Sequence, residues 1–178
     1  MIPFCSHDKT KYKNTFLKGD ESIFSNWYPS KFSFTTADFQ KSLGIKLLPR
    51  EFENVEQGMM YGKAALFKDY DVATQIMESG NPKDVRSFGR KVKDYDDDVW
   101  SNIRYEYTKA LIMEKFRQNK DLLIILKKTG NMILVEGAWY DKIWGVGLKD
   151  TDPAIHDVKN WKGENLLGKA LMEVRDLL

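Results

Sequence analysis

The expected fold class follows from one stretch, MILVEGAWYDKIWGVGL, which runs from Met132 to Leu148. Its first five residues form a short apolar run that is typical of a buried strand. The segment from Gly137 to Gly147 mixes glycine with aromatic residues and predicts a turn. Helical patterns flank this unit on both sides without a regular alternation of strand and helix. The sequence therefore predicts an α+β fold rather than a doubly wound sheet.

Helices are expected before and after that strand. Asn54 is a good N-cap, and Gln57 three residues later completes a capping-box pattern, so a helix should run to about Phe67 or Lys68. Asn81 and Pro82 predict another helix start. Asn165 is expected to cap the last helix, which runs to Leu178. The other expected helices cover residues 70–79, 82–91, about 96–118 and 120–129.

The remaining segments complete the expected architecture. Residues 1–21 are predicted to be an extended N-terminal segment, and Ile23 to Phe34 to hold two short strands around a turn. Residues 35–53 and 149–162 are expected to be loops. Together these segments predict a mostly helical α+β single domain over residues 1–178, with a small sheet.

Bulk composition excludes several classes of protein. The 178 residues are 42% apolar and 30% charged, as in ordinary globular chains, and the net charge of +2 comes without a Lys/Arg block. Cys5 is the sole cysteine, so an intrachain disulfide cannot form and a reducing compartment is expected. The N-terminus lacks a signal-peptide pattern, and the longest apolar run, Leu122 to Leu126, is too short to span a bilayer. We therefore expect a cytoplasmic protein that does not insert into a membrane.

The sequence offers few kinds of catalytic group. His7 and His156 are the two histidines, and neither has metal-ligand spacing to another His or Cys. Ser-His-Asp, phosphate-loop and dinucleotide-binding patterns are absent from the sequence. We therefore expect no metal and no cofactor. The remaining groups are carboxylates, cations and aromatic rings, and metal-free carboxylate chemistry suggests glycosyl transfer or hydrolysis through an oxocarbenium-like state.

Three carboxylates are candidates by position alone. Glu56 lies in the first turn of the helix that Asn54 begins, where the helix dipole favours the ionised form that a cation stabiliser or general base needs. Glu136 ends the apolar strand, and Asp141 lies in the turn that follows. Each has a simpler explanation, because an acid at a helix start or in a turn often serves stability alone.

Cations and aromatic residues accompany these acids. Lys63 lies seven residues after Glu56, two turns along the same helix face, and Arg90 follows Gly89 near a helix end. Both could bind phosphate, although an ordinary surface role is common for either. Trp144, beside Gly145, could hold a flat ligand or simply fill the core.

Five segments in order resemble the NADAR family. They are FSNWYPSKF (24–32), VEQGMMYGKAALF (55–67), NPKDVRSFGRKV (81–92), ILVEGAWYDKIWGVGL (133–148) and NWKGENLLGKALMEVR (160–175). The resemblance implies an α+β fold and enzymes that break a C1′–N bond without a metal. YbiA-type members are N-glycosidases of ribosylamino-pyrimidine intermediates of riboflavin synthesis, which release ribose 5-phosphate. Other members remove ADP-ribose from guanine bases.

The resemblance also implies roles for single residues. Glu56 matches the acidic residue of the V/A-E-H/Q motif, and Asp141 matches the Asp of D-x-x-W-G, so both inherit a catalytic role. Gly163 and Gly168 match the family's G-x-N-x-L-G. The residues expected to bind substrate are Phe24, Asn26, Trp27, Lys63, Arg90, Trp100, Glu136, Trp144 and Asn165.

The substrate stays open at this stage. Gly58 stands where family members usually carry Tyr, which predicts a more open pocket wall. Residues 37–52 are longer than the family's usual approach to the catalytic helix, and the loop 149–162 is absent from the short YbiA form and resembles a longer subgroup. The expected partner is a small nucleotide-like substrate or ADP-ribosylated nucleic acid. The alternatives are a non-catalytic module that binds ADP-ribose or a nucleotide, and a structural interaction domain.

Overall fold

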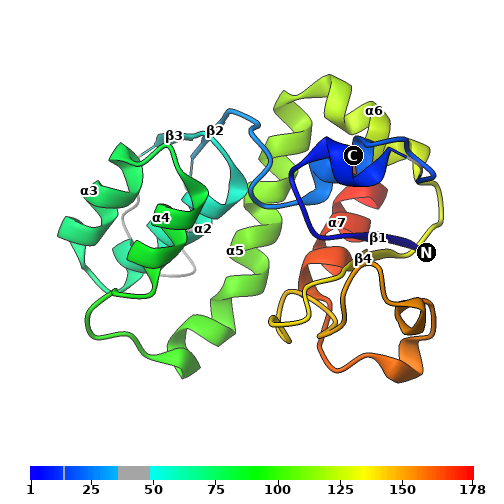
Figure 1. Ribbon diagram of the computed structural model, residues 1–178. Coiled ribbons are helices and arrows are strands. Elements are labelled where there is room, and N and C mark those ends of the chain that lie inside the picture. The colour runs from blue at the N-terminus through cyan, green and yellow to red at the C-terminus, as the bar shows by residue number, and fades with distance from the viewer. Residues whose placement is uncertain (14, 36–48) are drawn as a thin grey trace. The chain divides into compact units, whose positions relative to one another are not determined.

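The computed structural model describes residues 1–13, 15–35 and 49–178 (Figure 1). These residues form two compact units: unit 1 combines Met1–Tyr28 with Lys120–Leu178, and unit 2 is Pro29–Asn119. The fold is α+β and mostly helical, as predicted. The elements are β1 (Ile2–Phe4), η1 (Lys9–Tyr12), η2 (Asp20–Phe24), β2 (Phe32–Phe34), β3 (Arg50–Phe52), α2 (Val55–Leu66), α3 (Tyr70–Glu78), α4 (Pro82–Gly89), α5 (Asp97–Gln118), α6 (Lys120–Lys128), β4 (Leu134–Glu136), η3 (Pro153–His156), η4 (Val158–Asn160) and α7 (Leu166–Leu177).

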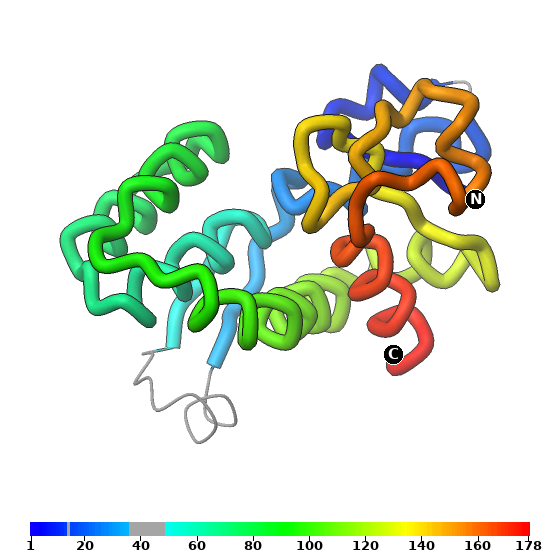
Figure 2. Tube along the Cα trace, turned by 90° about the horizontal axis from the view of Figure 1, so that it is seen from below, coloured from blue at the N-terminus to red at the C-terminus, as the bar shows by residue number. Residues whose placement is uncertain are grey.

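The helices of unit 2 begin where the sequence predicted. The Asn54 side chain accepts a hydrogen bond from the Gln57 N–H at 2.9 Å, and Asn81 and Asp96 cap α4 and α5 in the same manner. The Gln57 side chain departs from a standard capping box, because its Oε1 accepts from the Glu53 N–H. α2 packs against α3, α4 and α5. In Figure 2 these helices form the part of the trace that runs from cyan through green to light green.

Two glycines allow α5 to approach α2 closely. A Cβ at Gly62 would lie 2.3 Å from the Tyr107 ring, and one at Gly58 would lie 2.8 Å from the Leu111 side chain. The Tyr107 hydroxyl donates to the Gly58 carbonyl oxygen at 3.0 Å. The expectation that Gly58 opens a pocket wall is therefore wrong. Gly58 is buried because α5 occupies the space that a side chain would need.

Short strands differ from the prediction around unit 2. β2 and β3 pair antiparallel, with Phe32 opposite Phe52. Residues 50–52 were expected to be loop, and the two strands predicted over 23–34 reduce to β2, because residues 20–24 form the 3-10 helix η2. The expectations for residues 36–48 lie outside the described residues.

In unit 1 the N-terminal segment is part of the fold rather than an extended lead-in. β1 pairs parallel with β4, with Phe4 opposite Glu136 (Figure 1). The side chains of Ile2, Phe4 and Tyr12 are buried. The prediction of an extended lead-in was wrong because burial of these three side chains removes apolar surface from water, which stabilises the packed segment even though polar residues surround them in the sequence.

The last helix of unit 1 begins at the predicted place by a different means. Asn165 has a left-handed backbone with φ of 55°, and its side chain makes no capping hydrogen bond to α7. Instead its Oδ1 accepts from the Glu136 N–H at 3.0 Å, and its Nδ2 donates to the Leu134 carbonyl oxygen at 2.9 Å. The prediction of a side-chain cap at Asn165 is therefore wrong, because the amide pairs with β4 as a neighbouring strand would.

The loop 149–162 is packed against the strand. Ile155 is buried in a cluster with Val135 and Val146, and Trp161 packs on the same cluster while its Nε1 donates to the Ile155 carbonyl oxygen at 2.8 Å. Two 3-10 helices, η3 and η4, lie within this loop. No helix in the described parts of the chain is both long enough and apolar enough to cross a membrane.

Candidate active site

Glu56 occupies the second position of α2 and is 5% exposed. The role of capping this helix belongs to Asn54, whose side chain accepts from Gln57 N–H, and not to Glu56. The Gln57 amide is also committed, because its Nε2 donates to the carbonyl oxygens of Ile76 and Ser79. Glu56 is therefore a buried acid in the first turn of a helix whose N-terminus is capped by another residue, Asn54.

Lys63 lies two turns further along α2, about 10 Å along the helix axis from Glu56. Its Nζ donates to the Gly89 carbonyl oxygen at 2.8 Å and sits 3.9 Å from the centre of the Tyr95 ring. Partial burial lowers the pKa of Lys63, and the neighbouring Arg90 lowers it further, while Asp97 acts in the opposite direction. The structure thus brings Lys63 and Arg90 into one electrostatic neighbourhood at the end of α4, with the Arg90 side chain exposed.

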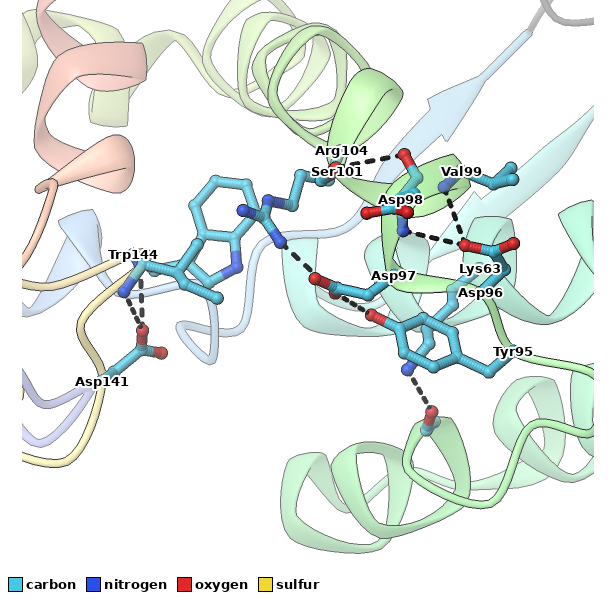
Figure 3. Close-up of polar contacts among 12 residues, drawn as sticks. Lys63, Tyr95, Asp96, Asp97, Asp98, Val99, Ser101, Arg104, Asp141 and Trp144 are labelled. Atoms are coloured by element: carbon cyan, nitrogen blue, oxygen red, sulfur yellow. Dashed lines mark hydrogen bonds and ion pairs between the residues drawn. The ribbon is translucent and has the colours of Figure 1, made fainter.

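Three residues that sequence reasoning missed extend this neighbourhood (Figure 3). The Tyr95 hydroxyl donates to Asp97 Oδ1 at 2.5 Å, and burial followed by this hydrogen bond raises the pKa of Tyr95 to about 12. Arg104 Nη1 lies 3.7 Å from the same oxygen of Asp97. A signal for them exists in the sequence, since Asp97 and Arg104 are seven residues apart and share one face of α5.

Trp100, predicted to bind substrate, lies on the buried face of α5. It is 5% exposed and packs edge-on against Tyr107, with ring centroids 6.4 Å apart. This contact places it in the core of unit 2.

In unit 1, Glu136 ends β4 and is 8% exposed. Its N–H donates to Asn165, and its carbonyl oxygen accepts from the Val146 N–H at 3.0 Å. The Cys5 side chain lies against the Glu136 carboxylate, and burial, followed by this negative charge, raises the pKa of the thiol to about 12. Cys5 is therefore a neutral neighbour of Glu136 at ordinary pH.

Asp141 shapes the turn that carries Trp144. Its Oδ1 accepts from the N–H groups of Ile143, at 3.0 Å, and Trp144, at 2.8 Å (Figure 3). The Trp144 carbonyl oxygen accepts from the Leu167 N–H at 3.2 Å, so the turn is tied to the start of α7. One oxygen of Asp141 thus has a structural task, and the Trp144 side chain is half-buried.

The aromatic residues predicted near the N-terminus differ in exposure. Phe24 is 1% exposed and packs edge-on against Phe4, so it is a core residue of unit 1. Asn26 is buried as well. Trp27 is half-buried, and its ring lies 5.9 Å from that of His7.

The predicted residues therefore form two groups. Unit 2 brings together Lys63 and Arg90 near the C-terminus of α4, with Glu56 and Trp100 elsewhere in the same unit. Unit 1 brings together Glu136 and Asn165 at β4, with Asp141 and Trp144 in the following turn. The unit 2 group thus supplies cations and a buried carboxylate, and the unit 1 group supplies carboxylates beside the half-buried Trp144 ring.

Comparisons with known proteins give this arrangement a context. A sequence model described as "NADAR domain" matches residues 13–178. Protein irg-1 of Caenorhabditis elegans is 38% identical, over 98% of this chain and 84% of that protein. N-glycosidase R617 of Acanthamoeba polyphaga mimivirus is 34% identical over 86% of each chain. The NMR structure of the E. coli protein YbiA shares the fold, with a TM-score of 0.68 and 22% identity, over 99% of this chain and 83% of that chain.

Proposed function

The chain belongs to the NADAR family, and from that membership we propose that it is an N-glycosidase. It hydrolyses the C1′–N bond of a ribosylated base or amine. The names of relatives support this reaction class, among them the N-glycosidases of mimivirus and Nostoc punctiforme and a riboflavin biosynthesis protein of Vibrio vulnificus.

The observation that carries the proposal is the state of Glu56. It is a buried acid in the first turn of α2, and Asn54 performs the capping that would otherwise explain an acid there. The helix dipole favours a carboxylate at this place. Glu56 then stabilises the oxocarbenium-like state or activates the attacking water, and the stabilisation applies to the transition state rather than to the neutral substrate.

The cations supply the binding of the sugar phosphate. Lys63 is half-buried and lies beside Arg90, so an anionic group that approaches them regains some of the electrostatic energy that partial desolvation removed. We assign Asp141 an assisting catalytic role and Trp144 contact with the base or sugar. The substrate is either ADP-ribosylated guanine in nucleic acid or a phosphorylated ribosylamino-pyrimidine.

The test measures release of free sugar from both substrates by the wild-type chain and by Glu56→Gln. The variant should lose at least about 100-fold in kcat on the substrate that the wild type cleaves, because it lacks the carboxylate charge. Glu53→Gln is the matched control, since Glu53 is exposed, pairs with Lys31 and lies three residues earlier. Both variants should melt at the wild-type temperature.

Two outcomes would refute the proposal. Undiminished turnover by Glu56→Gln would remove Glu56 from the chemistry. Binding of ADP-ribose by a wild-type chain that cleaves neither substrate would instead identify a nucleotide-binding module.

A further inference from the structure

The Arg104 side chain is largely withdrawn from water and has few polar partners. Its side chain is 13% exposed, and in residues 1–13, 15–35 and 49–178 it has one polar contact, the 3.7 Å approach to Asp97. That distance exceeds a hydrogen bond. A guanidinium carries five N–H donors and is costly to withdraw from water without acceptors. The site therefore holds hydrogen-bonding capacity that these parts of the protein do not use.

A second arginine on the same helix shows the ordinary arrangement. Arg117 lies 2.7 Å from the Glu114 carboxylate, and its side chain is 59% exposed. Arg117 thus has a close carboxylate partner and a mostly exposed side chain, whereas Arg104 has no carboxylate within hydrogen-bond distance and a much less exposed side chain. The contrast separates a surface ion pair from a cation that is held without a close acceptor.

Arg104 and Lys63 are not one binding point. Tyr95 and Asp97 lie between them (Figure 3): the Lys63 ammonium sits over the Tyr95 ring, and the Tyr95 hydroxyl donates to the Asp97 oxygen that Arg104 approaches. A single phosphate group would have to displace both side chains to contact both cations. Two phosphate groups in one ligand could engage them separately.

Asp97 suits the role of a temporary partner. Its side chain is 68% exposed, so it can turn into solvent when a stronger acceptor arrives. The cap of α5 does not depend on it, because Asp96 accepts the hydrogen bonds from the N–H groups of Asp98 and Val99.

We propose that Arg104 is a second anion-binding position, distinct from Lys63, and that it takes one phosphate of a ligand that carries two. The ligand class is a nucleoside diphosphate sugar. This inference rests on the proposed function and deepens it, because it favours the larger of the two substrates. Arginine pairs with phosphate oxygens through two parallel hydrogen bonds, which fits a guanidinium whose donors are otherwise unused.

Calorimetric titration tests the assignment with two probes, ADP-ribose as the diphosphate and ribose 5-phosphate as the monophosphate. Arg104→Ala should weaken ADP-ribose binding about 10- to 100-fold, the range expected for hydrogen bonds to a charged group, and ribose 5-phosphate binding less than about 3-fold. Arg104→Lys should fall between the wild type and Arg104→Ala, because it keeps the charge and loses the fork. Arg117→Ala, the matched control, should change neither affinity. If Arg104→Ala fails to fold, Arg104→Gln replaces it.

Several results would overturn the assignment. They are unchanged ADP-ribose affinity in Arg104→Ala, an equal loss for both probes, and absence of saturable ADP-ribose binding by the wild type. The outcome is separable from that of the proposed function. An ADP-ribose affinity that depends on Arg104 in a chain without glycosidase activity would keep the site and refute the reaction. Turnover with an Arg104-independent affinity would do the reverse.

Discussion

Unit 1 and unit 2 hold their candidate residues in different ways. In unit 1 the polar groups are committed to backbone partners: Asn165 pairs with β4, and Asp141 accepts from two N–H groups of its own turn. In unit 2 the cations Lys63 and Arg104 are partly withdrawn from water, and Arg104 has no close carboxylate among the described residues. The candidate polar groups of unit 1 therefore hold its backbone in place, whereas Arg104 of unit 2 has N–H donors that a ligand could use.

The largest expected effect on stability comes from a substitution in unit 1, at Gly168, where α7 packs against β4. A Cβ there would lie 2.1 Å from the Leu134 carbonyl oxygen, so Gly168→Ala should lower the free energy of unfolding by more than about 3 kcal/mol. Gly62→Ala in unit 2 should cost less, because its Cβ would meet a side chain, the Tyr107 ring, rather than a backbone oxygen. Gly80→Ala, with open space around it, should stay within about 0.5 kcal/mol of wild type. Urea unfolding measures all three, and equal losses for Gly168 and Gly62 would contradict the expected order.

In unit 2, a buried lysine should make the free energy of unfolding depend on pH. Lys115 of α5 is 1% exposed, and burial lowers its pKa to about 7. Between this value and the ordinary lysine pKa of 10.5, the unfolded chain binds the extra proton. Stability should therefore rise with pH in that window, by at most about 1.4 kcal/mol per pH unit.

The variant that isolates this effect is Lys115→Met. Its stability should follow pH less steeply between about 7 and 10 than that of the wild type. Lys120→Met, at an exposed lysine, should retain the wild-type slope. Parallel curves for the wild type and Lys115→Met would show that Lys115 keeps its proton throughout this range.

The smallest expected change in stability separates the two tasks of Asp141. Asp141→Ala removes the acceptor for the Ile143 and Trp144 N–H groups and should cost about 1 kcal/mol. Asp141→Asn keeps that oxygen, so its melting temperature should match the wild type, while turnover falls at least about 10-fold if the charge assists catalysis. Full activity in Asp141→Asn would leave Asp141 with the turn alone.

Local chemistry was predictable from the sequence, and long-range pairing was not. Asn54, Asn81 and Asp96 cap helices through bonds to residues two or three positions away, so a short window of sequence contains the whole interaction. The Asn165 side chain bonds to Leu134 and Glu136, about thirty residues earlier. The window around Asn165 shows a favourable cap, and the competing partner lies outside it.

The candidate site shows the same limit. Glu56, Lys63 and Arg90 stood out because their positions on helices can be read from spacing, and the family resemblance reinforced them. Arg104 did not, because what distinguishes it is a missing close partner, which depends on how α5 packs and on where Asp97 points. Gly58 was misjudged for a related reason, since its neighbour Leu111 comes from another helix.

The parallel pairing of β1 with β4 sets an order of events during synthesis. Phe4 can pair with Glu136 only after the roughly 130 residues between them have been synthesised, which takes on the order of ten seconds. Unit 2 is continuous in the chain and is complete before β1 has a partner. Throughout that interval the apolar side chains of Ile2 and Phe4 lack their strand partner, and their burial is completed only when β4 has been synthesised.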